Sequence, residues 1–176
     1  MIRTRQRLSA GLAATAICVI VLSVLTTPTS TVASAEKTVP IAECEIDGFG
    51  LGGSANQMRE IFGEPEQDLV VKSRLNEYSH REYEYDGMRI VFSMNGRSAM
   101  SFYVSSPAFR LRSGIGVGST WIDIVEALGP GSRSSSGESI TYSYHVVDSK
   151  GEYVPAWLRF AMENKVVMSF SVVTKR

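Results

Sequence analysis

Hydrophobic and polar residues alternate in two stretches of the chain that repeat each other. Residues 92–104 and 160–172 are identical at six of thirteen positions when they are aligned at an offset of 68. In both stretches Phe, Met and Val recur at every second position, which is the period of a β-strand with one buried face. Gly96 and Asn164 occupy the matching turn position, and both residue types tolerate a positive φ. The pattern predicts a β-hairpin in each half, with turns at Asn95–Gly96 and Glu163–Asn164.

A short amphipathic helix is predicted ahead of each hairpin. Ser54 and Thr120 take the N-cap position, and Gly63 and Gly129 follow the last helical residue. The apolar residues between them fall on one face of each helix: Met58, Ile61 and Phe62 in the first, and Ile124, Ala127 and Leu128 in the second. Because helices of about nine residues are marginal alone, both are expected to pack on a sheet.

The remaining segments complete the predicted sheets. Residues 83–85 and 142–144 both read Tyr-x-Tyr and are predicted as strands. Residues 67–73 are a possible strand in the first half, whereas the Ser-rich and Gly-rich segment 131–137 is predicted to be a loop. The second half has nine extra residues within 145–156, which indicate a longer hairpin that projects from the sheet.

Together these elements predict an α+β protein made of two tandem repeats, residues 44–108 and 109–176. Each repeat is expected to be a short helix packed on a small antiparallel β-sheet. Residues 36–43 are predicted to be an N-terminal tether, because few of them can bury apolar surface.

Residues 1–35 have the three parts of a secretory signal peptide. Three arginines near the N-terminus are followed by an apolar run over residues 8–25 and by Ala-Ser-Ala at 33–35. We expect cleavage after Ala35 and a secreted or periplasmic protein. An uncleaved membrane anchor is the alternative, because the apolar run approaches the length that spans a bilayer.

The charge balance and the cysteines narrow the possible partners. Residues 36–176 carry 15 basic and 18 acidic residues, a net charge of −3. This argues against a nucleic-acid partner, which requires clustered basic charge, and gives no reason to expect a membrane partner after signal cleavage. Cleavage leaves one cysteine, Cys44. It is expected to be a partly buried apolar residue, and the alternative is a thiol that is free or paired with another chain.

Two pairs of motifs give the chain a resemblance to a known superfamily. They are Gly50-Leu51-Gly52-Gly53-Ser54 with Phe62-Gly63-Glu64-Pro65, and Gly114-Ile115-Gly116-Val117-Gly118-Ser119 with Leu128-Gly129-Pro130. With them the sequence resembles the superfamily that holds β-lactamase inhibitor protein and the outer-membrane assembly lipoprotein BamE (SmpA). The resemblance implies an exported, non-enzymatic binding module. The inhibitor's disulfide pairs and the lipid-attachment motif of BamE are absent from the sequence, so no matched residue supports either specific role.

The sequence offers no clear catalytic, cofactor or metal site. Residues 48–53 fit the G-x-G-x-x-G dinucleotide pattern, but no hydrophobic strand precedes them and the next helix is too short for a crossover. The two histidines have no third ligand at a known metal-binding spacing. A secreted hydrolase is kept as an alternative function. Its acid/base cluster would be His80, Glu82, Glu84 and Asp86.

The hairpin faces that point away from the helices form the predicted binding surface. Aromatic residues beside arginine are typical of protein interfaces. The candidate partner-binding residues are Arg89, Tyr103, Trp157, Arg159 and Tyr153. The alternative is that the two sheets bury these residues against each other. We therefore expect a module that binds another protein through its sheet face, or, as a sharper alternative, an inhibitor of a secreted or periplasmic enzyme.

Overall fold

One mixed β-sheet dominates the structure, a computed structural model that describes residues 37–72 and 79–175. The predicted signal peptide and its cleavage site lie outside these residues. The strands are β1 (Thr38–Pro40), β2 (Gln67–Lys72), β3 (Ser79–Tyr85), β4 (Met88–Phe92), β5 (Ala99–Val104), β6 (Ser132–Ser136), β7 (Ser139–Val147), β8 (Tyr153–Glu163) and β9 (Val166–Thr174). The helices are the 3-10 helix η1 (Ile41–Cys44) and the α-helices α1 (Ala55–Phe62) and α2 (Trp121–Leu128).

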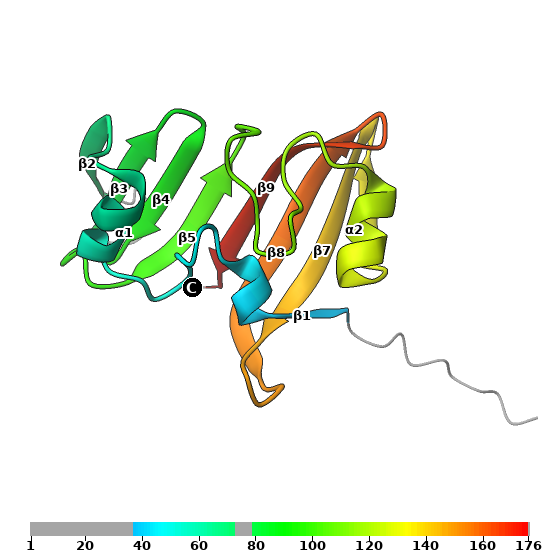
Figure 1. Cartoon of the computed structure of the whole chain (residues 1–176), viewed down its shortest axis with the longest axis horizontal. Helices are drawn as coiled ribbons and strands as arrows, with labels where there is room; N and C mark the ends of the chain where they lie inside the picture. Colours follow the sequence, from blue (N-terminus) through cyan, green and yellow to red (C-terminus); the bar gives the residue numbers. More distant parts are fainter. Residues whose placement is uncertain (1–36, 73–78, 176) are drawn as a thin grey trace, which may run out of the picture. The chain divides into compact units, whose positions relative to one another are not determined.

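Two antiparallel meanders join edge to edge to make the sheet (Figure 1). The first contains β2 to β5 and the second β6 to β9, and their last strands, β5 and β9, pair antiparallel with Tyr103 opposite Ser171. β1 adds a parallel pair with β7. The order across the sheet is β1-β7-β8-β9-β5-β4-β3-β2, with β6 also beside β7.

The predicted α+β architecture of two separate helix-on-sheet repeats is wrong. Within residues 37–72 and 79–175 the fold is mostly β, with one nine-stranded mixed sheet and two α-helices of eight residues each. The physical reason lies at the last strand of each meander, whose backbone N–H and C=O groups would be unpaired at a free edge. Pairing β5 with β9 satisfies both edges and merges the two halves.

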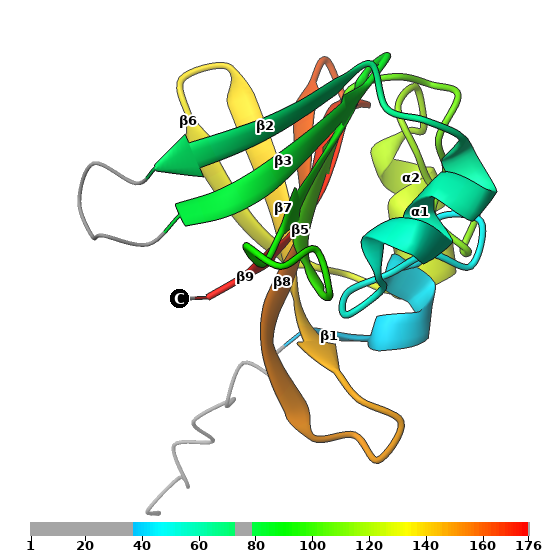
Figure 2. The ribbon, with the colours of Figure 1, turned by 90° about the vertical axis from the view of Figure 1, so that its left-hand side faces the viewer.

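The two predicted helices are confirmed, and both lie on the same face of the sheet (Figure 2). Ser54 accepts a hydrogen bond from the backbone N–H of Gln57, and Thr120 forms a full capping box with Asp123. Hydrogen bonds from Thr120 hold the pKa of the Asp123 carboxyl below its usual range. The cap residues therefore set both helix starts, as their sequence positions predict.

The second tyrosine of each Tyr-x-Tyr strand ties the sheet to the end of a helix. Tyr85 donates its hydroxyl hydrogen to the carbonyl of Gly63 at 3.0 Å, and Tyr144 donates to that of Gly129 at 2.7 Å. Burial raises the pKa of both tyrosines to about 12. Each bond satisfies a carbonyl that the helix end leaves without an internal partner.

The two hairpins are not superimposable at an offset of 68. Phe92 pairs with Ala99 across a loop of residues 93–98, whereas Met162 pairs with Val167 across a shorter turn. The strand before the turn is thus displaced by two residues between the halves. Met94 consequently lies in the loop and is 48% exposed, while Met162 is 2% exposed. The prediction that these two methionines pack alike is wrong.

The other repeated apolar positions and the two turns agree with the prediction only in part. Phe92, Phe102, Phe160 and Phe170 are buried, as expected, but Met168 is exposed and Met100 only partly buried. The first turn contains the predicted Gly96, with φ 67°. The second turn is centred on Asn164 and Lys165, with φ 50° and 66°, one residue later than predicted.

Three further segments test the predicted element boundaries. The possible strand at 67–73 is confirmed as β2, and the longer hairpin within 145–156 is confirmed as the β7–β8 hairpin. Residues 132–136, predicted to be loop, form β6 because their backbone pairs with β7 although every side chain is exposed. The predicted tether at 36–43 instead supplies β1 and most of η1, because Val39 is buried where β1 pairs with β7.

Cys44 ends η1 and is fully buried with a free thiol. Burial, with smaller contributions from Glu43 and Glu45, raises the pKa of this thiol from 9.0 to about 12. At pH 8 the thiolate population is therefore about 1,000-fold smaller in the folded than in the unfolded protein. We expect iodoacetamide to label the Cys44 peptide quickly in denaturant and hardly at all in the folded protein, as measured by mass spectrometry. Comparable labelling rates in both states would contradict this burial.

No helix among the described residues is both long enough and apolar enough to cross a membrane.

Candidate functional site

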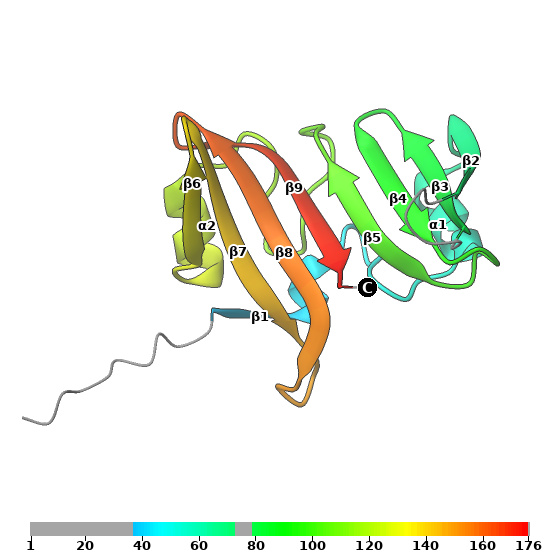
Figure 3. The same cartoon turned by 180° about the vertical axis from the view of Figure 1, so that it is seen from behind.

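In the described part of the chain no helix lies on the sheet face opposite α1 and α2, which we call the open face (Figure 3). Ile90 and Phe102 are buried toward the helices, while Arg89 and Tyr103 point to the other side and are exposed. Val91 and Ser101 also point to that side but are only 7% exposed, so the accessible part of this face lies at Arg89 and Tyr103. Because the two meanders meet edge to edge, they do not stack face to face. This excludes the alternative in which the sheets bury the candidate binding residues against each other.

One row of this open face crosses the junction between the meanders. Arg89 is opposite Tyr103, Tyr103 is opposite Ser171, and Ser171 is opposite Arg159 on β8. The guanidinium carbon of Arg89 lies 4.8 Å from the centroid of the Tyr103 ring. Neighbouring strands are about 4.8 Å apart, and Tyr103 and Arg159 are two strands apart. Their Cα atoms are therefore separated by only about 10 Å. Pairing of β5 with β9 thus brings together residues from both halves of the chain.

An aromatic cluster continues the open face from Arg159 toward the β7–β8 hairpin. The Arg159 guanidinium carbon lies 5.7 Å from the centroid of the Trp157 ring. The His145 ring is 3.5 Å from that of Trp157 and 5.5 Å from that of Tyr153, centroid to centroid. Tyr153, at the start of β8, is exposed. All five predicted binding residues therefore lie on one face, and His145 joins them through its contacts with Trp157 and Tyr153.

Glu82 is the centre of a polar group at the other end of the open face. Its carboxylate lies 2.8 Å from Nε2 of His80 and 3.7 Å from Nη1 of Arg89. The side chains of His80 and Glu82 are only 14% exposed, so this pair is largely shielded from solvent. A carboxylate two residues from a histidine on a strand is the sequence signal that could have suggested the contact.

The other two carboxylates of the proposed hydrolytic cluster are placed differently. Glu84 lies beside Arg89 on the neighbouring strand, and Asp86 is exposed at the turn after β3. In the described part of the chain, no group of three or more His, Cys, Asp or Glu side chains could hold a metal ion. The structure thus assembles one histidine–carboxylate pair from the predicted four residues.

The two arginines of the row differ in their partners. Arg89 has Glu82 within ion-pair distance, whereas Arg159 makes no ion pair with any residue in the described ranges. Arg159 is exposed, and serines at 143 and 171 flank it on the adjacent strands. Its charge is therefore available on the open face, with the ring of Trp157 fixing its position.

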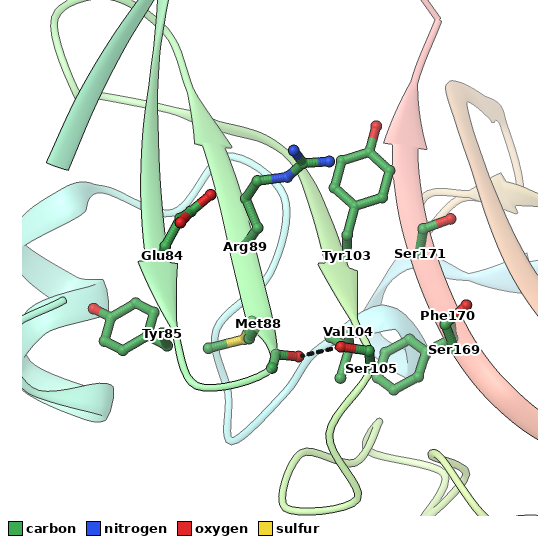
Figure 4. Close-up of a pocket in the computed structure, with 11 residues that line it drawn as sticks. Glu84, Tyr85, Met88, Arg89, Tyr103, Val104, Ser105, Ser169, Phe170 and Ser171 are labelled. Atoms are coloured by element: carbon green, nitrogen blue, oxygen red, sulfur yellow. Dashed lines mark hydrogen bonds between the residues drawn. The ribbon is translucent and has the colours of Figure 1, made fainter. Parts of the chain in front are cut away.

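A groove of about 370 Å³ lies at the junction of the meanders (Figure 4). Glu84, Arg89 and Tyr103 form one wall, and Ser169 and Ser171 form the other. It lies where β5 ends at Val104 while β9 extends further along the sheet. The sheet is thus hollowed beside Tyr103, where polar side chains and the apolar residues Met88, Val104 and Phe170 together line the groove.

Comparisons with known proteins return two structural likenesses. No protein-family model and no curated protein matches the sequence. The first likeness is an extracellular Bacillus anthracis protein that contains an SCP domain: TM-score 0.45, 11% identity, covering 71% of this chain and 44% of that one. The second is a Streptococcus mutans protein provisionally described as a β-lactamase inhibitor: TM-score 0.28, 19% identity, covering 68% of this chain and 82% of that one. This chain therefore spans less than half of the first protein.

Proposed function

We propose that this chain is an exported, non-enzymatic protein that binds another protein through the open face of its sheet. The observation that carries the proposal is the row Arg89, Tyr103, Ser171 and Arg159, continued by Trp157 and His145. Arginine, tyrosine and tryptophan are the residue types on which interface energy concentrates. The buried side chains on the reverse of the same strands make this surface rigid before a partner arrives.

The arrangement favours a macromolecular partner over a small ligand. The row extends over four strands and both meanders, so a partner must cover several strands to use all of it. Arg89 and Arg159 are both held over aromatic rings, which reduces the rotamer freedom that binding would otherwise remove. The groove beside Tyr103 offers a place where a partner's side chain can insert.

Affinity capture from the secreted and envelope fractions tests the proposal. We expect the purified protein to retain a partner, and Trp157→Ala to weaken that interaction by about 30-fold, as a central aromatic contact worth about 2 kcal/mol would. Arg97→Ala is the control, because Arg97 is an exposed cation in the β4–β5 loop, away from the row. The affinity of each variant for the captured partner is measured by calorimetry.

The outcome also separates the two forms of this proposal. Capture of a hydrolase whose activity falls when the protein is added identifies an inhibitor, and capture of any other protein identifies a binding module of another kind. Equal affinity of the wild type, Trp157→Ala and Arg159→Ala for the partner would remove the open face from the mechanism.

A further inference from the structure

A second groove lies on the helix side of the sheet, near the start of α2. It has a volume of about 210 Å³ and is lined by Trp121, Arg133, Ile140, Tyr142, Met162 and Lys165. Ile140 and Met162 are paired across β7 and β8 and share the sheet face that carries the buried Phe160. The groove therefore faces away from the row of Arg89 and Arg159 and is independent of the proposed function.

The groove combines apolar walls with positive charge that has no partner in the described part of the chain. Trp121 is 38% exposed, so part of its indole ring forms an accessible wall of the groove. Neither Arg133 nor Lys165 forms an ion pair with any described residue. The acidic residues at the adjacent strand ends, Glu138 and Glu163, line a neighbouring hollow instead.

In the first meander, charged side chains around Tyr83 close the position that corresponds to this groove. Arg133 is opposite Tyr142, just as Asp68 is opposite Tyr83. There the carboxylate of Asp68 accepts two hydrogen bonds from Arg81, at 2.6 and 2.8 Å. The guanidinium groups of Arg59 and Arg81 lie 5.1 and 5.6 Å from the ring centroid of Tyr83, which is fully buried. A carboxylate between cations thus covers the tyrosine.

In the second meander apolar residues, Val125 and Ile140, replace the two cations of that cluster, and a cation replaces its carboxylate. Arg133 stands where the first meander has Asp68, and Tyr142 is only partly buried. Larger side chains also replace smaller ones at the first residue of the helix and in the hairpin turn. The backbone N–H of Ala55 donates to the carbonyl of Gly96, and at the equivalent place the N–H of Trp121 donates to that of Lys165. Trp121 and Lys165 therefore replace alanine and glycine.

Lys165 occupies a backbone conformation that suits glycine better. Its φ is 66°, and Gly96 at the equivalent hydrogen-bonded place has φ 67°. The second central position of such a two-residue turn favours glycine because a side chain is strained there. Lys165 therefore places its charge beside the groove in a conformation that costs some stability.

We propose that this groove binds an acidic residue of a partner protein together with an adjacent apolar side chain. The carboxylate lies between Arg133 and Lys165, the two cations that line the groove. The apolar side chain packs on Trp121 and Tyr142. A peptide source fits better than an anionic membrane, because residues 36–176 carry a net charge of −3 and the groove offers only two cations.

The test is a titration followed by nuclear magnetic resonance on the purified protein. The probe is acetyl-Phe-Glu-Leu-amide, and its counterpart with Gln in place of Glu is the uncharged control. Trp121 and Trp157 are the two tryptophans of the chain, so their indole N–H signals distinguish this groove from the open face. We expect the Glu peptide to shift the Trp121 signal and to bind about tenfold more tightly than the Gln peptide.

Variants separate a binding role from a structural one. We expect Lys165→Gly to weaken binding of the Glu peptide about tenfold while raising the midpoint of urea unfolding, because glycine relieves the strained turn. Arg133→Gln should weaken binding similarly, and Arg97→Gln should leave it unchanged. Equal binding of the two peptides, unchanged affinity of Lys165→Gly, or a shift confined to the Trp157 signal would each overturn the proposal. Binding of phosphatidylglycerol vesicles in place of the peptide would overturn it in favour of a lipid.

Discussion

Replacing Phe102 with alanine is expected to lower the free energy of unfolding by about 3–5 kcal/mol, because it leaves a cavity at the centre of the core. Phe102 is 1% exposed on β5, where it pairs with Ile90 on β4 and with Val172 across the junction. Urea unfolding followed by circular dichroism measures the change. Because the lost contacts belong to both meanders, the loss is expected in a single transition of the whole sheet.

Tyr103→Ala is the matched control for this prediction. Tyr103 is the next residue on the same strand, but it points to the open face and is 37% exposed. Its main described contact is the stacked guanidinium of Arg89, so we expect a loss of about 1 kcal/mol or less. Similar losses for both variants, or two separate unfolding transitions, would contradict the single sheet with one open face.

The second large effect is expected at the β3–β4 turn, where Gly87→Ala should destabilise the protein by about 2–5 kcal/mol. Gly87 has φ +75°, and a Cβ there would lie 2.3 Å from Cβ of Ser106 and 3.0 Å from its backbone nitrogen. The backbone N–H groups of Ser105 and Ser106 donate to the carbonyl of Gly87. A methyl group therefore adds an overpacking cost to the cost of the left-handed backbone.

Gly137→Ala isolates the backbone contribution. Gly137 also sits in a strand-connecting turn, with φ +61°, but a Cβ there would have no atom within 4 Å. We expect about 1–2 kcal/mol at this site from conformation alone. If thermal and urea unfolding gave equal losses for the two variants, the segment leaving β5 would not be held against the β3–β4 turn.

Much of the candidate site follows from alternation along single strands. The period of two places Arg89 and Tyr103 on the side opposite Ile90 and Phe102, and it survives the two-residue displacement between the hairpins because two is a whole period. The alternation could not show that Arg159 joins the same row, because that depends on which strand edges pair. It also missed the contacts of His145 with Trp157 and of His80 with Glu82.

The groove beside α2 was not predictable from the pattern. Arg133 lies in a serine-rich segment with no hydrophobic period, so nothing in the sequence marks residues 132–136 as a strand. Ordinary alignment of the halves places Lys165 with Arg97, whereas the hydrogen bonds place it with Gly96. The groove becomes visible only when backbone pairing, and not residue identity, defines which positions correspond.

The sequence by itself determined most local elements: two capped helices, the main hairpins and the face on which residues such as Arg89 and Tyr103 lie. These depend on interactions between residues close in the chain, such as a cap or an alternating pattern, and residue types carry that information. Only the tertiary structure decided that β5 pairs with β9, that a single sheet results, and that residues from both halves share one open surface. Strand edges join through backbone N–H and C=O groups, which are the same in nearly every residue, so the sequence pattern does not specify which edges meet.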